Sequence, residues 1–221
     1  MPSIKTLDEY QQRAVGLRRN DTTEGWEQLN ELIIGDEGTE VFTQHGDSFA
    51  LLAPKGLWKP YQILIARPAT RFGMAEEVGD VLWVAADSLA RKETTLSSAV
   101  RTAMEKHSLD PTECETMEQL GAVALAGADR ISVPTKDALT DSKFRGPKEI
   151  SLADNPFSVY LRTVLRVMKS LNPDNVSEGQ PTAIDFEAAQ PLALSVGELV
   201  LATAYIFEAR LKNTNCTGSR F

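Results

Sequence analysis

Basic residues, histidines and cysteines are all scarce in this sequence. It has 23 Lys and Arg against 31 Asp and Glu, which gives a formal net charge of −8. Binding to a nucleic-acid polymer depends on clustered cations, so this balance argues against DNA or RNA as a partner. The two histidines and two cysteines form no cluster, which excludes a conventional cysteine–histidine zinc site.

Long hydrophobic runs are absent as well. No apolar stretch approaches the roughly 18 to 20 residues that a membrane-spanning helix requires. The N-terminus MPSIKTLDEYQQ lacks the basic start and apolar core of a signal peptide. We therefore expect a cytoplasmic protein with reduced thiols and no membrane partner. Its 221 residues suffice for one large domain or two small ones.

Hydrophobic periodicity predicts helices along most of the chain. Thr6 followed by Glu9 forms a capping box, which opens a helix that runs to about residue 18. Pro191 either kinks the last helix or starts it afresh. The further helices are predicted over 23–44, 74–92, 95–107, a stretch after Pro111, 157–171 and 186–212. The fold class is therefore all-α, a helical bundle.

Two connections interrupt this helical pattern. Residues 47–73 contain three prolines and the β-prone run YQILIA, so they predict a long connection with at most a short extended segment. Residues 133–156 are rich in Lys, Asp, Ser and Pro, and they predict a polar connection.

The second predicted helix directs acidic residues along its apolar side. Trp26, Leu29 and Ile33 have the three-to-four spacing of a buried stripe. At about 100° per residue, Glu37 and Glu40 continue that stripe. A pair of inward carboxylates is therefore expected near the end of this helix.

The third predicted helix repeats the pattern. Glu77 shares an arc with Val81 and Ala85, and Asp80 lies at its margin. Four inward carboxylates would repel one another, so a cation is expected to compensate them. Hard divalent cations with oxygen ligands suit such a set, Mg²⁺ above all, and Mg²⁺ commonly bridges to substrate phosphates.

The two acidic stretches, GDEGTEV (35–41) and EEVGDVLW (76–83), resemble the motifs of the MazG-like all-α nucleotide pyrophosphohydrolases. That superfamily includes dimeric dUTPases, dCTP pyrophosphatases and phosphoribosyl-ATP pyrophosphatase. LDEYQQRA and FEARLKN also look like the first and last helices of one bacterial and phage branch. The resemblance implies hydrolysis of a nucleoside triphosphate between the α- and β-phosphates, giving monophosphate and pyrophosphate.

The resemblance also implies roles for individual residues. Glu37, Glu40, Glu77 and Asp80 would bind Mg²⁺, with Mn²⁺ as a substitute, and Glu37 or Glu40 would orient or deprotonate the attacking water. Candidate contacts to the substrate are cations of the 47–73 connection, a tryptophan that can stack on a base, and two residues of the closing helix: Lys55, Lys59, Arg67, Arg71, Trp58, Lys212 and Asn213.

The resemblance covers residues 5 to about 92. We expect 1–110 to form the MazG-like metal-binding unit and 111–221 to add helices within one compact domain. SVGELVLATAYIFEARL can be aligned with EVGDVLWVAADSLARK without a gap, which pairs Ser195, Gly197 and Glu198 with Glu77, Gly79 and Asp80. The C-terminal half is then either a degenerate second copy, forming an internal pseudo-dimer, or a set of unrelated helices of similar composition. A homodimer is the other expected arrangement.

Three functions remain open from the sequence. The first is a Mg²⁺-dependent pyrophosphohydrolase that acts on a small nucleotide for nucleotide-pool control. The second is a catalytically inactive helical module that binds nucleotide or metal. The third is a helical interaction protein whose acids form a solvated face.

Overall fold

The computed structural model describes residues 4–17, 24–45, 71–112, 114–134, 149–174, 184 and 187–208. Within the helices that border residues 46–70, side chains are described through Gly38 and from Glu77 onward. The elements are α1 (Leu7–Gly16), α2 (Trp26–His45), α4 (Arg71–Arg91), α5 (Leu96–Lys106), α6 (Met117–Ala126), β1 (Ser132–Pro134), β2 (Glu149–Ser151), α8 (Pro156–Leu171) and α9 (Leu192–Ile206). The structure is mostly helical, which confirms the predicted all-α class.

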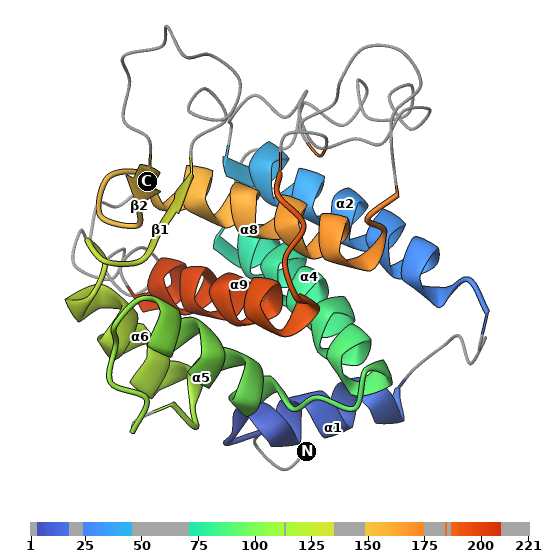
Figure 1. Ribbon diagram of the computed structural model, residues 1–221, viewed down its shortest axis with the longest axis horizontal. Coiled ribbons are helices and arrows are strands. Elements are labelled where there is room, and N and C mark those ends of the chain that lie inside the picture. Colours follow the sequence, from blue (N-terminus) through green and yellow to red (C-terminus); the bar gives the residue numbers. More distant parts are fainter. Residues whose placement is uncertain are drawn as a thin grey trace, which may run out of the picture.

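Helix α9 lies at the centre of the described fold (Figure 1). It packs against α4, α5, α6 and α8, while α2 packs against both α4 and α8. The side chains of α9 are buried from Ser195 to Ala204, and a helix that is apolar on all sides is stable only inside such a layer of neighbours. Both halves of the chain contribute to one hydrophobic core.

Local capping signals explain where several helices begin. Thr6 and Glu9 form the predicted capping box, and Thr95 caps α5 by accepting a hydrogen bond from the backbone of Ser98. Helix α9 begins at Leu192, directly after Pro191, and the described residues 187–190 before it are not helical. The predicted start of this helix at residue 186 is therefore wrong, and the proline precedes the helix instead of kinking it. None of the described helices combines the length and hydropathy that crossing a bilayer requires.

Helix α1 is fixed to the turn between α4 and α5 by a buried glutamine. The Gln11 side-chain amide donates to the carbonyl oxygens of Ala86 and Thr94 at 3.1 and 2.8 Å. Its oxygen accepts the backbone N–H of Leu96 at 2.9 Å. These three bonds, to α4, to the turn that follows it and to the first residue of α5, hold α1 in one position against α4.

The prediction of a polar connection over 133–156 is wrong at both ends, where the structure has strands and the start of a helix. β1 and β2 pair antiparallel, with Val133 opposite Ile150, and α8 begins at Pro156. Val133 is buried and Ile150 packs on the core, so burial of these two apolar side chains stabilises the pairing. Each strand has only three residues, which is too short to show an alternating pattern.

The prediction of which side chains of α2 face the core is also wrong in part. Trp26 is buried as expected, but Leu29 and Ile33 are only half-buried, and the inner face instead carries Asn30 and Ile34. The close approach of α2 to α8 is one reason. A Cβ atom added to Gly38 would lie 2.9 Å from Val164 Cγ1, so only glycine lets the two helices meet at this distance.

Candidate metal centre

Helices α2 and α4 run antiparallel where they pack. Asn30 contacts Ser88 late in α4, whereas Glu37, two turns further along α2, lies close to Glu77 and Asp80 early in α4. A polar contact fixes this register, because Asn30 Nδ2 donates to Ser88 Oγ at 2.9 Å in a buried position. The acidic end of α2 is therefore held against the acidic start of α4.

The structure brings three of the four predicted metal ligands together. Glu37, Glu77 and Asp80 each offer one carboxylate oxygen, and these oxygens all lie within 4.8 Å of one another. Glu37 is partly buried and Asp80 is exposed, so the cluster opens to solvent on one side. Glu40 is a residue of α2, and its side chain lies outside the described part of the chain.

The predicted substrate contacts cannot be placed. Arg71 is the first residue of α4, and its side chain lies outside the described part. The other predicted contacts fall outside the described residues: Lys55, Trp58, Lys59, Arg67, Lys212 and Asn213. So does the predicted 47–73 connection, except for its last three residues, which belong to α4.

The chemistry of the cluster fits a hard divalent cation. Three carboxylates at this separation repel one another when all are ionised, and a cation between them would offset that repulsion. Oxygen donors alone, without histidine or thiolate, match the preference of Mg²⁺ and Mn²⁺. The exposed side leaves room for the water and phosphate ligands that Mg²⁺ usually retains.

A tyrosine that the sequence analysis did not single out borders the cluster. The Tyr10 hydroxyl donates to the Gly79 carbonyl oxygen at 3.1 Å, and its ring meets Trp83 edge-to-face at 5.9 Å between centroids. Burial, and then the negative charge of Asp80, raise the pKa of Tyr10 well above its usual range. Tyr10 therefore remains a neutral hydrogen-bond donor beside the acids.

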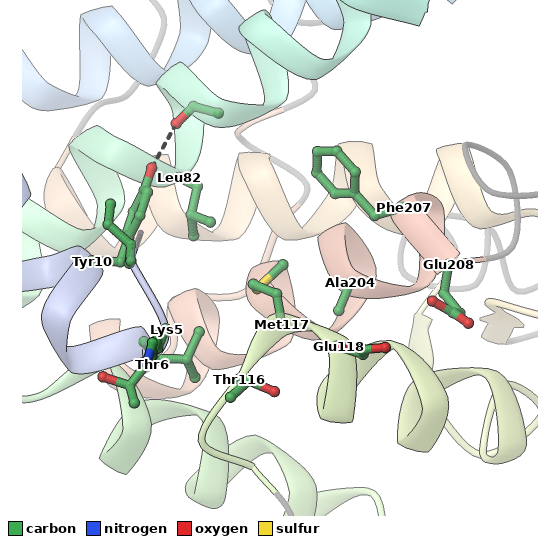
Figure 2. Close-up of a pocket in the computed structure, with 13 residues that line it drawn as sticks. Lys5, Thr6, Tyr10, Leu82, Thr116, Met117, Glu118, Ala204, Phe207 and Glu208 are labelled. Atoms are coloured by element: carbon green, nitrogen blue, oxygen red, sulfur yellow. Dashed lines mark hydrogen bonds between the residues drawn. The ribbon is translucent and has the colours of Figure 1, made fainter. Parts of the chain in front are cut away.

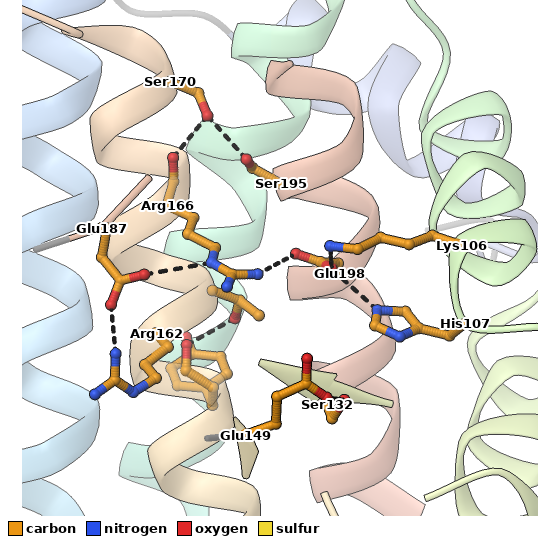
Figure 3. A network of polar contacts seen from close by, with 12 residues as sticks. Lys106, His107, Ser132, Glu149, Arg162, Arg166, Ser170, Glu187, Ser195 and Glu198 are labelled. Atoms are coloured by element: carbon orange, nitrogen blue, oxygen red, sulfur yellow. Dashed lines mark hydrogen bonds and ion pairs between the residues drawn. The ribbon is translucent and has the colours of Figure 1, made fainter. Parts of the chain in front are cut away.

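A second polar network lies between α8, α9 and α5 (Figure 3). Arg166 donates to Glu198 at 2.9 Å and to Glu187 at 3.3 Å, and Glu198 also contacts Lys106 at 2.6 Å and His107 at 2.9 Å. His107 is the C-cap of α5 and is buried. The sequence analysis did not identify this network.

The α2–α4 helix pair and the α8–α9 helix pair differ at corresponding contacts. In the gapless alignment Glu198 corresponds to Asp80. Asp80 meets Glu37 of α2, whereas Glu198 meets Arg166 of α8. An internal guanidinium thus compensates the carboxylate in the second pair. Whether the second helix pair is a copy of the first stays a prediction.

Comparison with known proteins assigns neither a family nor a function to this chain. No family model matches the chain, and neither the curated proteins nor the solved structures give a significant match. The resemblance to the MazG-like enzymes therefore rests on the quoted sequence motifs alone.

Proposed function

We propose that this protein is a Mg²⁺-dependent nucleoside triphosphate pyrophosphohydrolase, which yields nucleoside monophosphate and pyrophosphate. The observation that carries the proposal is the meeting of Glu37, Glu77 and Asp80 within 4.8 Å. Two separate helices supply these acids at the spacing of the family motif. A divalent cation between the two helices would offset the repulsion of carboxylates at this separation, which supports the proposal over a solvated acidic face.

The acidic residues have two roles in the proposed reaction, metal binding and activation of water. Glu37, Glu77 and Asp80, with Glu40 as the fourth member, would bind the cation. When bound, Mg²⁺ would neutralise the phosphate charge and position the triphosphate. Glu37 or Glu40 orients a water molecule and accepts its proton. The water oxygen forms a bond to the α-phosphorus, and the bond from that phosphorus to the bridging oxygen breaks, so that pyrophosphate leaves.

A pyrophosphate-release assay tests the reaction directly. The eight common NTPs and dNTPs are incubated with the protein in Mg²⁺ or in EDTA, and both products are identified. We expect monophosphate and pyrophosphate in Mg²⁺ alone. Orthophosphate and diphosphate as products would contradict the proposed bond cleavage. Metal and nucleotide binding without turnover would instead establish the inactive binding module.

Substitutions within the cluster, compared with a control substitution on α5, test whether the cluster is the catalytic site. Glu77→Gln and Asp80→Asn remove ligand charge with little change in shape, and we expect each to lower kcat/KM by about two orders of magnitude or more. Glu105→Gln removes an exposed carboxylate from α5 and should leave kcat/KM unchanged. Equal activity in all three variants would show that the cluster is not the catalytic site.

A further inference from the structure

Tyr10 of α1 contacts the turn of α4 that carries Asp80. The Tyr10 hydroxyl donates to the carbonyl oxygen of Gly79 at 3.1 Å (Figure 2), and its ring meets the ring of Trp83 edge-to-face. In an α-helix the carbonyl oxygen of one residue also accepts the backbone N–H four residues later, so Gly79 and Trp83 lie at the two ends of one turn. Asp80, which contributes an oxygen to the acidic cluster, lies within that turn.

This turn has little side-chain support at Gly79. A Cβ atom added to Gly79 would meet nothing within 4 Å, and Gly79 and Tyr10 both line a cavity of about 810 Å³. Glycine also stabilises a helix less than alanine does, because its backbone loses more conformational freedom on folding. The hydrogen bond from Tyr10 therefore supports α4 at a point where neither packing of a side chain nor helix propensity does so.

Helix α1 is fixed by contacts that do not involve the acidic cluster. Gln11 follows Tyr10 in the chain, and its buried side chain makes three hydrogen bonds to α4, to the turn after it and to α5. Asp8 accepts the backbone N–H and the hydroxyl of Ser97 at 3.0 and 2.8 Å. The Tyr10 hydroxyl is therefore held in place independently of the acids.

The acids themselves act to separate α2 from α4. The three carboxylate oxygens of the cluster lie within 4.8 Å of one another, and ionised carboxylates at this separation repel when no cation lies between them. The bond from Asn30 fixes α4 only at Ser88, which is about 12 Å along the helix from Asp80. The bond from Tyr10 acts on the residue directly before Asp80.

We propose that Tyr10 is a positioning residue of the metal centre. Its hydroxyl holds the turn of α4 that carries Asp80 in the position at which acids of α2 and α4 can share one cation. The inference rests on the proposed function for the identity of the site as a metal centre, but it does not require turnover. Tyr10 acts through the Gly79 carbonyl and contacts neither the cation nor the substrate.

Two tyrosine variants test this role. Tyr10→Phe removes the hydroxyl and keeps the ring that packs on Trp83. Tyr205→Phe is the matched control, because Tyr205 packs on the core from α9 and its hydroxyl has no hydrogen bond to any residue that the structure describes. Each variant loses a single oxygen atom from a partly buried ring, so both proteins should remain folded.

The first measurement is the binding of Mn²⁺ alone, followed by electron paramagnetic resonance well below the unfolding temperature. We expect Tyr10→Phe to raise the Kd for Mn²⁺ about three- to tenfold, because losing one hydrogen bond lowers the population of the arrangement that is competent to bind. Tyr205→Phe should match the wild type. An equal Kd in the wild type and Tyr10→Phe would overturn the inference and leave the proposed reaction standing.

The remaining outcomes separate the inference from the proposed function. Weaker Mn²⁺ binding in Tyr10→Phe, together with no cleavage of any triphosphate by the wild type, would support the positioning role and contradict the proposed hydrolysis. No binding of Mn²⁺ by the wild type would overturn both.

Hydrogen–deuterium exchange in EDTA distinguishes positioning from a general structural role. Backbone amides of residues 77–83 should exchange faster in Tyr10→Phe than in the wild type, while those of α9 should change little. In a Glu37→Gln background the repulsion is weaker, so Tyr10→Phe should accelerate this exchange less. Equal acceleration in both backgrounds would show that the hydroxyl supports α4 without acting on the acids, and would overturn the inference.

Discussion

Arg166 Nη1 donates to Glu198 Oε2 at 2.9 Å, and the two side chains are 2 % and 0 % exposed. This ion pair lies at the centre of the network that joins α8 to α9 and α5 (Figure 3). A buried charge is tolerated only when its partners remain in place, so the network ties the position of α9 to that of its neighbours.

Replacing Arg166 by methionine should destabilise the protein strongly. The substitution keeps apolar bulk but leaves Glu198 and Glu187 without their shared guanidinium, which typically costs about 3–5 kcal/mol in unfolding free energy. Lys169→Met on the same helix is the control, and it should change stability little because Lys169 is only half-buried. Urea denaturation measures both; equal midpoints would show that the ion pair does not contribute.

The contribution of Glu198 should depend on pH. Burial alone would raise the pKa of Glu198, but His107, Arg166 and Lys106 together lower it from 4.5 to about 2. A lowered pKa means that the stabilisation is complete above pH 4.5 and is lost as the pH falls towards 2, by about 3 kcal/mol in total.

Glu198→Gln provides the reference for this measurement. We expect the wild type to exceed the variant in unfolding free energy at pH 7, and the difference to shrink in denaturant titrations below pH 4.5. Glu187, whose pKa burial raises against the pull of Arg162 and Arg166, titrates in both proteins, so its contribution largely cancels. A difference that stays constant down to pH 3 would contradict the lowered pKa.

Two helical glycines should respond to alanine in opposite directions. At Gly38 the new Cβ would lie 2.9 Å from Val164 Cγ1, so Gly38→Ala should overpack the α2–α8 contact at a cost of about 1–3 kcal/mol, less the gain in helix propensity. At Gly79 the space is open, and Gly79→Ala should gain up to about 1 kcal/mol.

A double variant checks the cause of the Gly38 effect. Val164→Ala removes the methyl groups that the new Cβ would meet, so Gly38→Ala should cost less in that background than in the wild type. Thermal unfolding of the four proteins gives the coupling free energy. If Gly38→Ala lowers the unfolding free energy equally in both backgrounds, the contact with Val164 is not the cause of the destabilisation.

Neutralising one acid of the cluster should stabilise the metal-free protein. In EDTA, Glu37→Gln removes repulsion of about 1 kcal/mol, which corresponds to a rise in Tm of about 2–4 °C for a chain of this size. Added Mg²⁺ or Mn²⁺ should raise the Tm of the wild type and have little effect on the variant. Glu105→Gln is again the control, and no metal-dependent shift in the wild type would argue against a cation site.

Local signals in the sequence were sufficient for much of the secondary structure. Thr6 with Glu9, and Thr95 before α5, mark helix starts because a capping hydrogen bond involves residues only three positions apart. Glu77 and Asp80 were expected on one helix face because residues three apart lie on the same side of a helix whatever surrounds them. Their approach to Glu37 depends on how α2 packs on α4, which spacing along each helix does not determine.

The tertiary structure decided what no local pattern contains. It placed Asn30 rather than Leu29 on the inner face of α2, because that face is set by the close approach of Gly38 to α8 and by the hydrogen bond to Ser88. It buried Arg166, whose charge is compensated by residues more than 20 positions away. The sequence determined which residues share a helix face; only packing, which depends on distances between distant segments, determined what each face meets.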